Sequence, residues 1–143
     1  MRNNSSVCAY QRPSLAGLRV LVVDNNRDCS ELIKFLLEEF SVVVKIATTV
    51  KEALEVLAHR ETDVLISDIA MPGEDGYSLI RKIRSSERCE YLKRLPAIAM
   101  TAFITDNGCS LALESGFQVY TEKPFDMNKL VTTVATLAAP VPV

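Results

Sequence analysis

Five polar residues of this chain have the types needed for phosphoryl chemistry. Asp24 and Asp68 each follow a short apolar run, Asn25 follows Asp24, and Thr101 and Lys123 come later in the chain. Two carboxylates and an amide make a hard-oxygen pocket, which suits Mg2+ better than Zn2+. A metal would offset the charge on a carboxylate nucleophile and a phosphate, while Lys123 and Thr101 would hold the transferred oxygens. The set predicts Asp68 as the attacking group.

Each of these residues also has a purely structural interpretation. Asp68 at a strand end is a common turn-capping residue, Lys123 before a proline is a common solvated residue, and Thr101 is a common strand-end hydroxyl. Tyr120 fits a half-buried strand aromatic as well as a moving switch. The chemical interpretation therefore depends on the elements bringing Asp24, Asp68, Thr101 and Lys123 to one place.

The apolar pattern predicts strands that alternate with amphipathic helices. Asp63 and Pro72-Gly73 bound the apolar run before Asp68, which favours a buried strand. The predicted strands are 18–23, 42–47, 64–68, 96–100 and 117–120. The predicted helices are 28–40, 49–60 with a Thr49-x-x-Glu52 capping box, one around 79–83, 106–115, and one that begins after Asp126. Residues 85–95 are expected to form a charged connector that extends the third helix by a turn.

Five such units predict an α/β fold with a doubly wound, five-stranded parallel sheet and helices on both faces. Right-handed crossovers place every strand's carboxyl end at the same edge. The candidate residues all follow strands, so this edge is where we expect them to meet.

Composition supports one ordinary globular domain. The chain has 143 residues, is 48% hydrophobic and has a formal net charge of -2. Scattered basic residues argue against nucleic-acid binding. The four cysteines lack CxxC spacing, which predicts reduced thiols and no zinc site. The sequence has no apolar stretch long enough to span a membrane and no signal-peptide core. We therefore expect a cytoplasmic protein. Residues 1–16 are expected to be a flexible tail or linker, 17–139 the domain, and 140–143 a second tail.

Four motifs in register resemble the receiver domains of response regulators, the CheY-like family of two-component signalling. They are Val22-Val23-Asp24, Ser67 to Gly73 with Gly76, Met100-Thr101-Ala102, and Tyr120 to Phe125. The resemblance implies a flavodoxin-like (βα)5 fold with strand order 2-1-3-4-5. It also implies that Asp68 is the phosphoacceptor, that Lys123 contacts the phosphoryl group, and that Thr101 and Tyr120 are the switch pair. Mg2+ would bind Asp24, Asn25, Asp68 and the Ala70 carbonyl, and the bond before Pro124 would be cis.

Asn25 departs from the family pattern, which usually has two adjacent acidic residues after the first strand. An amide oxygen can still bind metal, but the site loses one formal negative charge. We therefore expect weaker Mg2+ binding and retained phosphorylation.

Three functions compete at this point. The first is a phosphorylatable receiver that takes its phosphoryl group from a sensor histidine kinase or a histidine phosphotransfer protein, with no enzymatic activity beyond its own phosphorylation and dephosphorylation. The second is a pseudo-receiver that binds partners without this chemistry, supported only by Asn25. The third, a flavodoxin-like cofactor binder, lacks a glycine-rich loop after the first strand. The fourth helix, fifth strand and fifth helix are the expected face for an output partner or a homodimer, and the domain is either a stand-alone regulator or part of a larger protein.

Overall fold

The computed structural model contains a five-stranded parallel sheet at its centre, and it describes residues 15–71, 73–87, 89–102, 105–123 and 126–138. The strands are β1 (Arg19–Val23), β2 (Val43–Ala47), β3 (Val64–Asp68), β4 (Ala97–Thr101) and β5 (Val119–Glu122). Their order is β2-β1-β3-β4-β5, with every neighbouring pair parallel. The predicted fold and strand order are confirmed.

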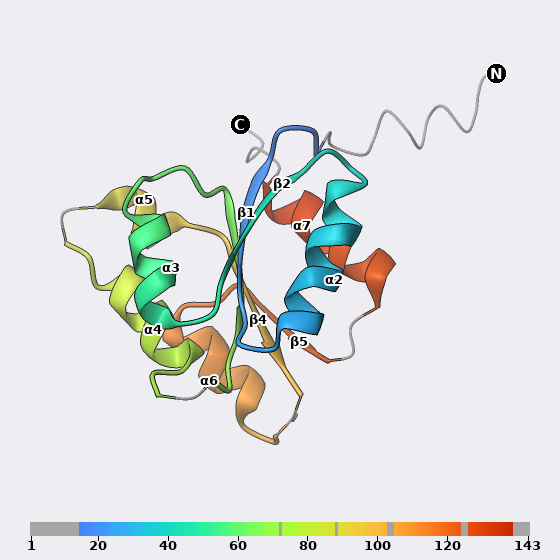
Figure 1. The fold of residues 1–143 in the computed structure, drawn as a ribbon. Coiled ribbons are helices and arrows are strands. Elements are labelled where there is room, and N and C mark those ends of the chain that lie inside the picture. The colour runs from blue at the N-terminus through green and yellow to red at the C-terminus, as the bar shows by residue number, and fades with distance from the viewer. Residues whose placement is uncertain (1–14, 72, 88, 103–104, 124–125, 139–143) are drawn as a thin grey trace.

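Helices cover both faces of the sheet (Figure 1). They are α2 (Arg27–Glu38), α3 (Val50–Leu57), α4 (Gly76–Arg84), α5 (Glu90–Arg94), α6 (Gly108–Ser115) and α7 (Met127–Ala138). Helices α2 and α7 lie on one face, and α3, α4 and α6 lie on the other. This doubly wound arrangement follows from right-handed crossovers between parallel strands.

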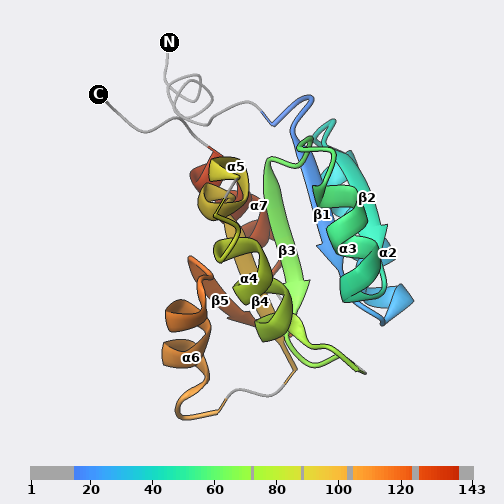
Figure 2. The ribbon, with the colours of Figure 1, turned by 90° about the vertical axis from the view of Figure 1, so that its left-hand side faces the viewer.

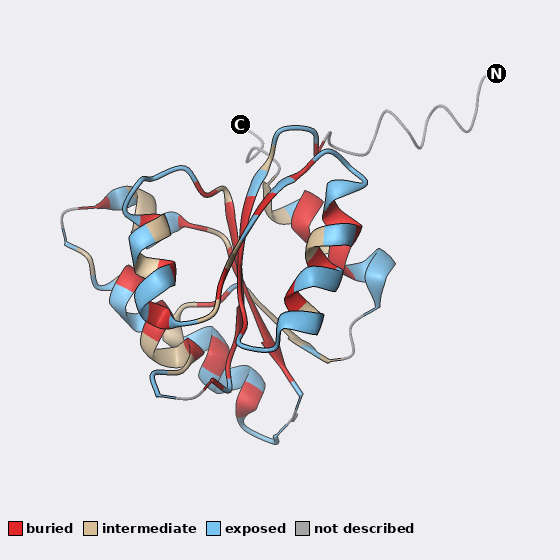
Figure 3. Cartoon of the chain, viewed as in Figure 1, coloured by how far each residue is buried: buried red, intermediate tan, exposed pale blue. Residues whose placement is uncertain are grey.

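Side chains that alternate along each strand divide the core into two clusters. In β1, Val20 and Val22 pack toward α2 and α7, while Leu21 and Val23 pack toward α3 and α4. Figure 3 shows the result as a largely buried central sheet between helices whose outer surfaces are exposed. The central strands β3 and β4 are buried at every position, as expected when helices cover both faces.

The last strand begins two residues later than the pattern predicts. Phe117 is buried and packs with the α3 and α4 cluster, but the backbone pairing starts with Val119 beside Ile98. Gln118 reaches the sheet through its N–H, which donates to the Ala97 carbonyl. A buried aromatic residue just before the strand gave the same signal as a strand residue.

The prediction that the 85–95 connector extends the third helix is wrong. Helix α4 ends at Arg84, and α5 is a separate short helix over Glu90–Arg94. The Arg84 guanidinium donates to the Leu92 and Lys93 carbonyls, so it holds α5 against the end of α4. Such long-range contacts leave no trace in helical periodicity.

The predicted capping of α3 is close to the observed one. Thr49 Oγ1 accepts from the Glu52 N–H, while the Glu52 carboxylate accepts from the N–H and the hydroxyl of Thr48. The carboxylate therefore reaches back one residue further than in the usual capping box.

Parts of the predicted organisation lie outside the described residues, namely 1–14, 139–143 and the peptide bond before Pro124. Leu15, within the predicted tail, is buried against the α2 and α7 cluster. Cys29, Cys89 and Cys109, the cysteines in the described ranges, are free thiols. Within those ranges, no helix is long and apolar enough to cross a membrane.

Candidate functional site

The carboxyl ends of the strands bring the predicted residues together at the lower edge of the sheet in Figure 2, called here the carboxyl edge. Asp24 follows β1, Asp68 ends β3, Thr101 ends β4 and Lys123 follows β5. The Lys123 backbone N–H donates to the Thr101 carbonyl oxygen, with an N···O distance of 2.7 Å. Four residues spread over 100 positions of sequence thus meet because the sheet is parallel.

Lys123 joins the two carboxylates. Its Nζ lies 2.6 Å from Asp24 Oδ2 and 3.4 Å from Asp68 Oδ2. Asp24 is fully buried and also accepts from the Asn26 N–H, whereas the Asp68 side chain keeps 8% of its surface exposed. Asp68 is therefore the carboxylate with an open approach from solvent.

The ionisation of the site reflects an excess of negative charge. Burial raises the pKa of Asp68, the nearby Asp24 carboxylate raises it further, and Lys123 and the Ala70 N–H only partly oppose this. Burial alone would lower the pKa of Lys123, but its hydrogen bond to Asp24 and the charges of both carboxylates raise it overall. One ammonium thus serves two buried carboxylates.

The remaining predicted site residues lie around this centre. Asn25 is exposed beside Asp24, and Ala70 follows Asp68 in the next loop with its N–H bonded to the Asp68 carboxylate. Thr101 is buried, with 4% of its surface exposed. Tyr120 is half-buried, and its hydroxyl oxygen would lie 2.3 Å from a Cβ placed on Gly108.

Gly76, part of the motif around Asp68, allows a close backbone approach at the site. A Cβ at this position would lie 2.4 Å from the Asp68 carbonyl oxygen and 2.9 Å from Ile69 Cα. Gly76 therefore lets the first turn of α4 pack directly against the backbone of the Asp68 loop. Gly73, with φ +77°, is the glycine that makes the turn itself.

Cys29 was missed as a neighbour of the site. Its thiol is hydrogen-bonded to the Asp24 carboxylate, and burial together with the two nearby carboxylates raises its pKa to about 11. Its position in the first turn of α2, five residues after Asp24, was the available signal. A thiol with such a pKa is a neutral hydrogen-bond donor rather than a nucleophile.

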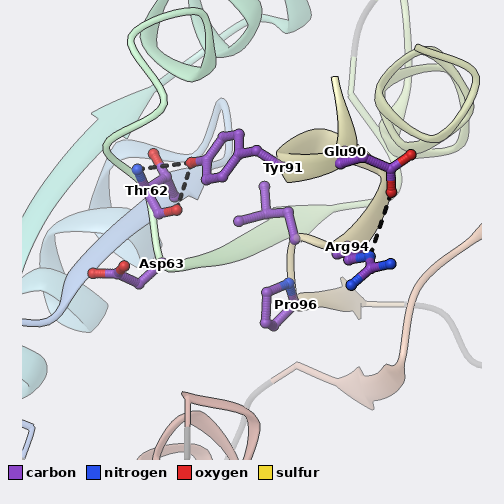
Figure 4. A pocket seen from close by; sticks show the side chains of 7 residues that line it. Thr62, Asp63, Glu90, Tyr91, Arg94 and Pro96 are labelled. Carbon is purple, nitrogen blue, oxygen red and sulfur yellow. Dashed lines mark hydrogen bonds and ion pairs between the residues drawn. The ribbon is translucent and has the colours of Figure 1, made fainter. Parts of the chain in front are cut away.

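A hollow of about 490 Å³ lies at the opposite edge of the sheet. Figure 4 shows the Tyr91 side chain pointing toward Thr62, with Arg94 paired to Glu90. Tyr91 accepts from the Thr62 N–H at 2.8 Å, Glu90 pairs with Arg94, and Asp63 accepts from Arg19, so the charged side chains that line this hollow already have partners. The reactive residues belong to the carboxyl edge instead.

The model of the response regulator receiver domain matches residues 20–135, which is most of the chain. This chain belongs to the response regulator receiver domain family. A phosphoacceptor role is general for receiver domains, which are modules of two-component response regulators.

Similar proteins occur in several signalling architectures. The chain is 40% identical to an uncharacterized 14.6 kDa protein of Leptolyngbya boryana, over 85% of this chain and 90% of that protein. It is 31% identical to the transcriptional regulatory protein GltR of Pseudomonas aeruginosa and 30% identical to the hybrid signal transduction histidine kinase D of Dictyostelium discoideum. The match to GltR includes 87% of this chain and 50% of GltR. The match to the hybrid kinase includes 86% of this chain and 8% of the kinase.

Solved receiver structures share the fold. A putative response regulator from Chloroflexus aurantiacus is 29% identical with a TM-score of 0.80, and the match covers 87% of this chain and 99% of that one. The receiver domain of Francisella response regulator 1452 is 30% identical with a TM-score of 0.77, covering 85% and 97%.

Receiver domains generally depend on Mg2+, and the residues of this site fit that ion. Asp24 and Asp68 are two buried carboxylates that repel each other, and the resulting rise in the pKa of Asp68 is what a nearby cation would reverse. No group of three or more His, Cys, Asp and Glu side chains suited to a metal occurs in the described ranges. Beside the two carboxylates, the Asn25 amide, the Ala70 carbonyl and water would supply the remaining oxygens, which are ordinary ligands of Mg2+.

Proposed function

We propose that this chain is a working receiver whose Asp68 accepts a phosphoryl group. The observation that carries the proposal is the single Lys123 ammonium shared between two buried carboxylates, of which Asp68 alone is open to solvent. In this arrangement Asp24 fixes Lys123, and Lys123 faces the oxygen that would carry the phosphoryl group. Asp68 is then positioned as the nucleophile rather than as a turn cap.

In the proposed reaction an Asp68 carboxylate oxygen attacks the phosphorus atom of a phosphohistidine. The P–N bond breaks as the P–O bond forms, the imidazole leaves and takes up a proton, and Asp68 becomes an acyl phosphate. Lys123 and the Thr101 side chain stabilise the transferred oxygens. Bound Mg2+, held by Asp24, Asp68, Asn25 and the Ala70 carbonyl, would supply further charge stabilisation. Hydrolysis of the acyl phosphate ends the signal, and we propose no separate enzymatic substrate.

The phosphoryl donor is proposed to be a sensor histidine kinase or a histidine phosphotransfer protein, in the cytoplasm. Helix α2, whose first turn borders Asp24, exposes two large apolar side chains one turn apart, Leu32 at 47% and Phe35 at 66%. Exposed apolar side chains beside a reactive site are typical of a protein contact. A small donor such as acetyl phosphate would not need them, so Phe35→Ser should slow transfer from the protein donor and leave labelling by acetyl phosphate unchanged.

Asn25 is proposed to make Mg2+ binding weaker than in a site with two adjacent acidic residues. We expect Asn25→Asp to tighten Mg2+ binding about tenfold, because a full negative charge is added near a divalent ion at a screened, exposed position. Calorimetric titration of both proteins with Mg2+ measures this effect. Asn25→Ser, which keeps a neutral oxygen, is the control, and equal affinity of the wild-type and Asp forms would contradict the proposal.

The signal is proposed to leave through Thr101 and Tyr120 to the face of α6, β5 and α7. A phosphoryl group on Asp68 offers new acceptor oxygens to Thr101, so the loop after Thr101 would move toward Asp68 and Tyr120 would turn inward. Leu111 and Leu113 of α6 and Met127 of α7 are exposed apolar side chains on these helices, available to an output partner or a second copy. Hydrogen exchange with and without beryllofluoride, a phosphoryl mimic, should change within the segment from Thr101 to Gly116 and around Tyr120. Changes confined to the loops that carry Asp24 and Asp68 would favour the pseudo-receiver instead.

A further inference from the structure

Helix α6 is held at both ends by side chains from other elements. Its first residue, Gly108, lies against the Tyr120 ring, since a Cβ there would be 2.3 Å from the hydroxyl oxygen and 3.0 Å from Cζ. Its cap, Gly116, lies against Arg84, whose Cγ would be 2.6 Å from a Cβ on that glycine. The two contacts differ in kind, because one is a ring against backbone and the other is a set of hydrogen bonds.

Arg84 binds four oxygen atoms at the end of α4. Its Nε donates to the Gly116 carbonyl at 3.0 Å, and its Nη2 donates to Gln118 Oε1 at 3.1 Å. Its Nη1 donates to the carbonyls of Leu92 and Lys93 at 2.9 and 3.0 Å. One guanidinium thus ties the ends of α4, α5 and α6 to the residue that enters β5.

The hydrogen bonds of Arg84 are unfavourable to break, so they hold the Gly116 end of α6 firmly. No carboxylate pairs with Arg84 in the part of the chain that the structure describes, and burial lowers its pKa. A half-buried guanidinium without a counter-ion depends on its carbonyl partners, so releasing any of them leaves a charge poorly solvated. Gln118 is fixed in turn, because its Oε1 also accepts from the Ala97 N–H at 2.7 Å.

The opposite end of α6 has weaker attachments. Asn107 at the N-cap makes no side-chain capping bond, and the buried residues of the helix are only Gly108 and Ala112. The contact there is with Tyr120, the residue proposed to turn when Asp68 is phosphorylated. Stiffness at one end and weak attachment at the other allow rotation of the helix about the stiff end.

We propose that Arg84 is the pivot of α6, so that phosphorylation moves the Gly108 end of the helix while the Gly116 end stays fixed to α4. This inference rests on the proposed function, since it describes how the same site sends its signal. Helix α4 begins at Gly76, packed on the Asp68 loop, and ends at Arg84, so the pivot is attached to the site through one rigid helix. Arg84 is a positioning residue in this scheme.

The first test uses the unphosphorylated protein. Arg84→Met keeps the length of the stem but removes every donor, and it should speed exchange of the Gly116 and Phe117 amides, which donate to Ala112, by about tenfold. Tyr91→Phe is the matched control, because it removes hydrogen bonds at the same edge without touching α6. Unchanged exchange of both amides in Arg84→Met would overturn the anchoring.

The second test adds Mg2+ and beryllofluoride. In the wild-type protein exchange should change at the amides of Gly108 and Leu111 and stay the same at Gly116 and Phe117. In Arg84→Met the change should spread along the whole helix, and Arg84→Lys should fall between the two. Equal changes at both ends of α6 in the wild type would overturn the pivot.

Labelling by acetyl phosphate separates the two proposals. Arg84→Met should be labelled like the wild type, because Arg84 lies at the far end of α4 from Asp68. A labelled wild-type protein whose whole α6 changes refutes only the pivot. A wild-type protein that takes up no phosphoryl group refutes the proposed function, and with it any phosphorylation-driven pivot.

Discussion

The two edges of the sheet differ in how well their charged and polar groups are paired. At the edge where the strands begin, Arg19 donates to Asp63, Tyr91 bonds Thr62, and Arg84 bonds carbonyl and amide oxygens, so each group has a suitable partner. At the carboxyl edge, Asp24 and Asp68 share one ammonium and repel each other. The first edge closes the fold, whereas the second keeps negative charge in excess for a cation and a phosphoryl group. Functional sites commonly retain such unfavourable arrangements at the expense of stability.

The largest expected effect comes from removing Lys123, the cation that Asp24 and Asp68 share. Lys123→Met leaves the buried Asp24 without its ammonium, and we expect a loss of about 3 kcal/mol in the free energy of unfolding at neutral pH. Urea denaturation measures the loss, and added Mg2+ should recover part of it.

The control for that variant is Lys82→Met, which breaks an exposed ion pair with Glu74. Water screens such surface pairs, so they contribute little and the control should be close to wild type. Equal losses in the two variants would mean that the carboxyl edge has no special need for a cation.

A smaller effect is expected where α4 meets the Asp68 loop. Gly76→Ala should lower the free energy of unfolding by about 2 kcal/mol, because the new Cβ would overlap the Asp68 carbonyl oxygen. In Gly73→Ala the new Cβ would have no atom within 4 Å, and only the positive φ would strain the backbone. The free energy of unfolding should therefore fall by about 1 kcal/mol. Thermal unfolding of both variants compares steric overlap with backbone strain, and a larger loss at Gly73 would contradict the close-approach role of Gly76.

The smallest effect should be a gain in stability. Because the pKa of Asp68 is raised in the folded protein, ionised Asp68 opposes folding above that pKa and has no such effect below its unfolded value. Asp68→Asn should therefore raise the free energy of unfolding at pH 7, on the order of 1 kcal/mol, and the gain should shrink as the pH falls toward 4. Asp63→Asn at the opposite edge should instead lose stability, since Asp63 accepts from the Arg19 backbone and side chain. A loss of stability in Asp68→Asn at pH 7 would remove the contrast between the two edges.

The sequence was sufficient to predict the architecture and the residues that meet at the carboxyl edge. Short apolar runs followed by Asp24, Asp68 and Thr101 mark strand ends, and the parallel sheet places all strand ends at one edge. The structure does bring Lys123 between the two carboxylates, so the predicted cluster exists.

Other features depend on contacts between distant residues and could not be predicted in the same way. The separate helix α5 is held by Arg84, the late start of β5 depends on its pairing with β4, and the role of Gly76 depends on how closely α4 approaches Asp68. Cys29 joined the site only because α2 turns its thiol toward Asp24. Apart from the position of Cys29 five residues after Asp24, none of these features has a local pattern of spacing or composition.

The most direct test of the central claim is intact-mass spectrometry after incubation with acetyl phosphate and Mg2+. The wild-type protein should gain one acid-labile phosphoryl group, Asp68→Asn should gain none, and Asp63→Asn should be labelled like the wild type. Omitting Mg2+ should greatly reduce labelling of the wild type. Labelling of Asp68→Asn at the wild-type level would show that the acceptor is another residue and would contradict the assignment of Asp68 as the phosphoacceptor.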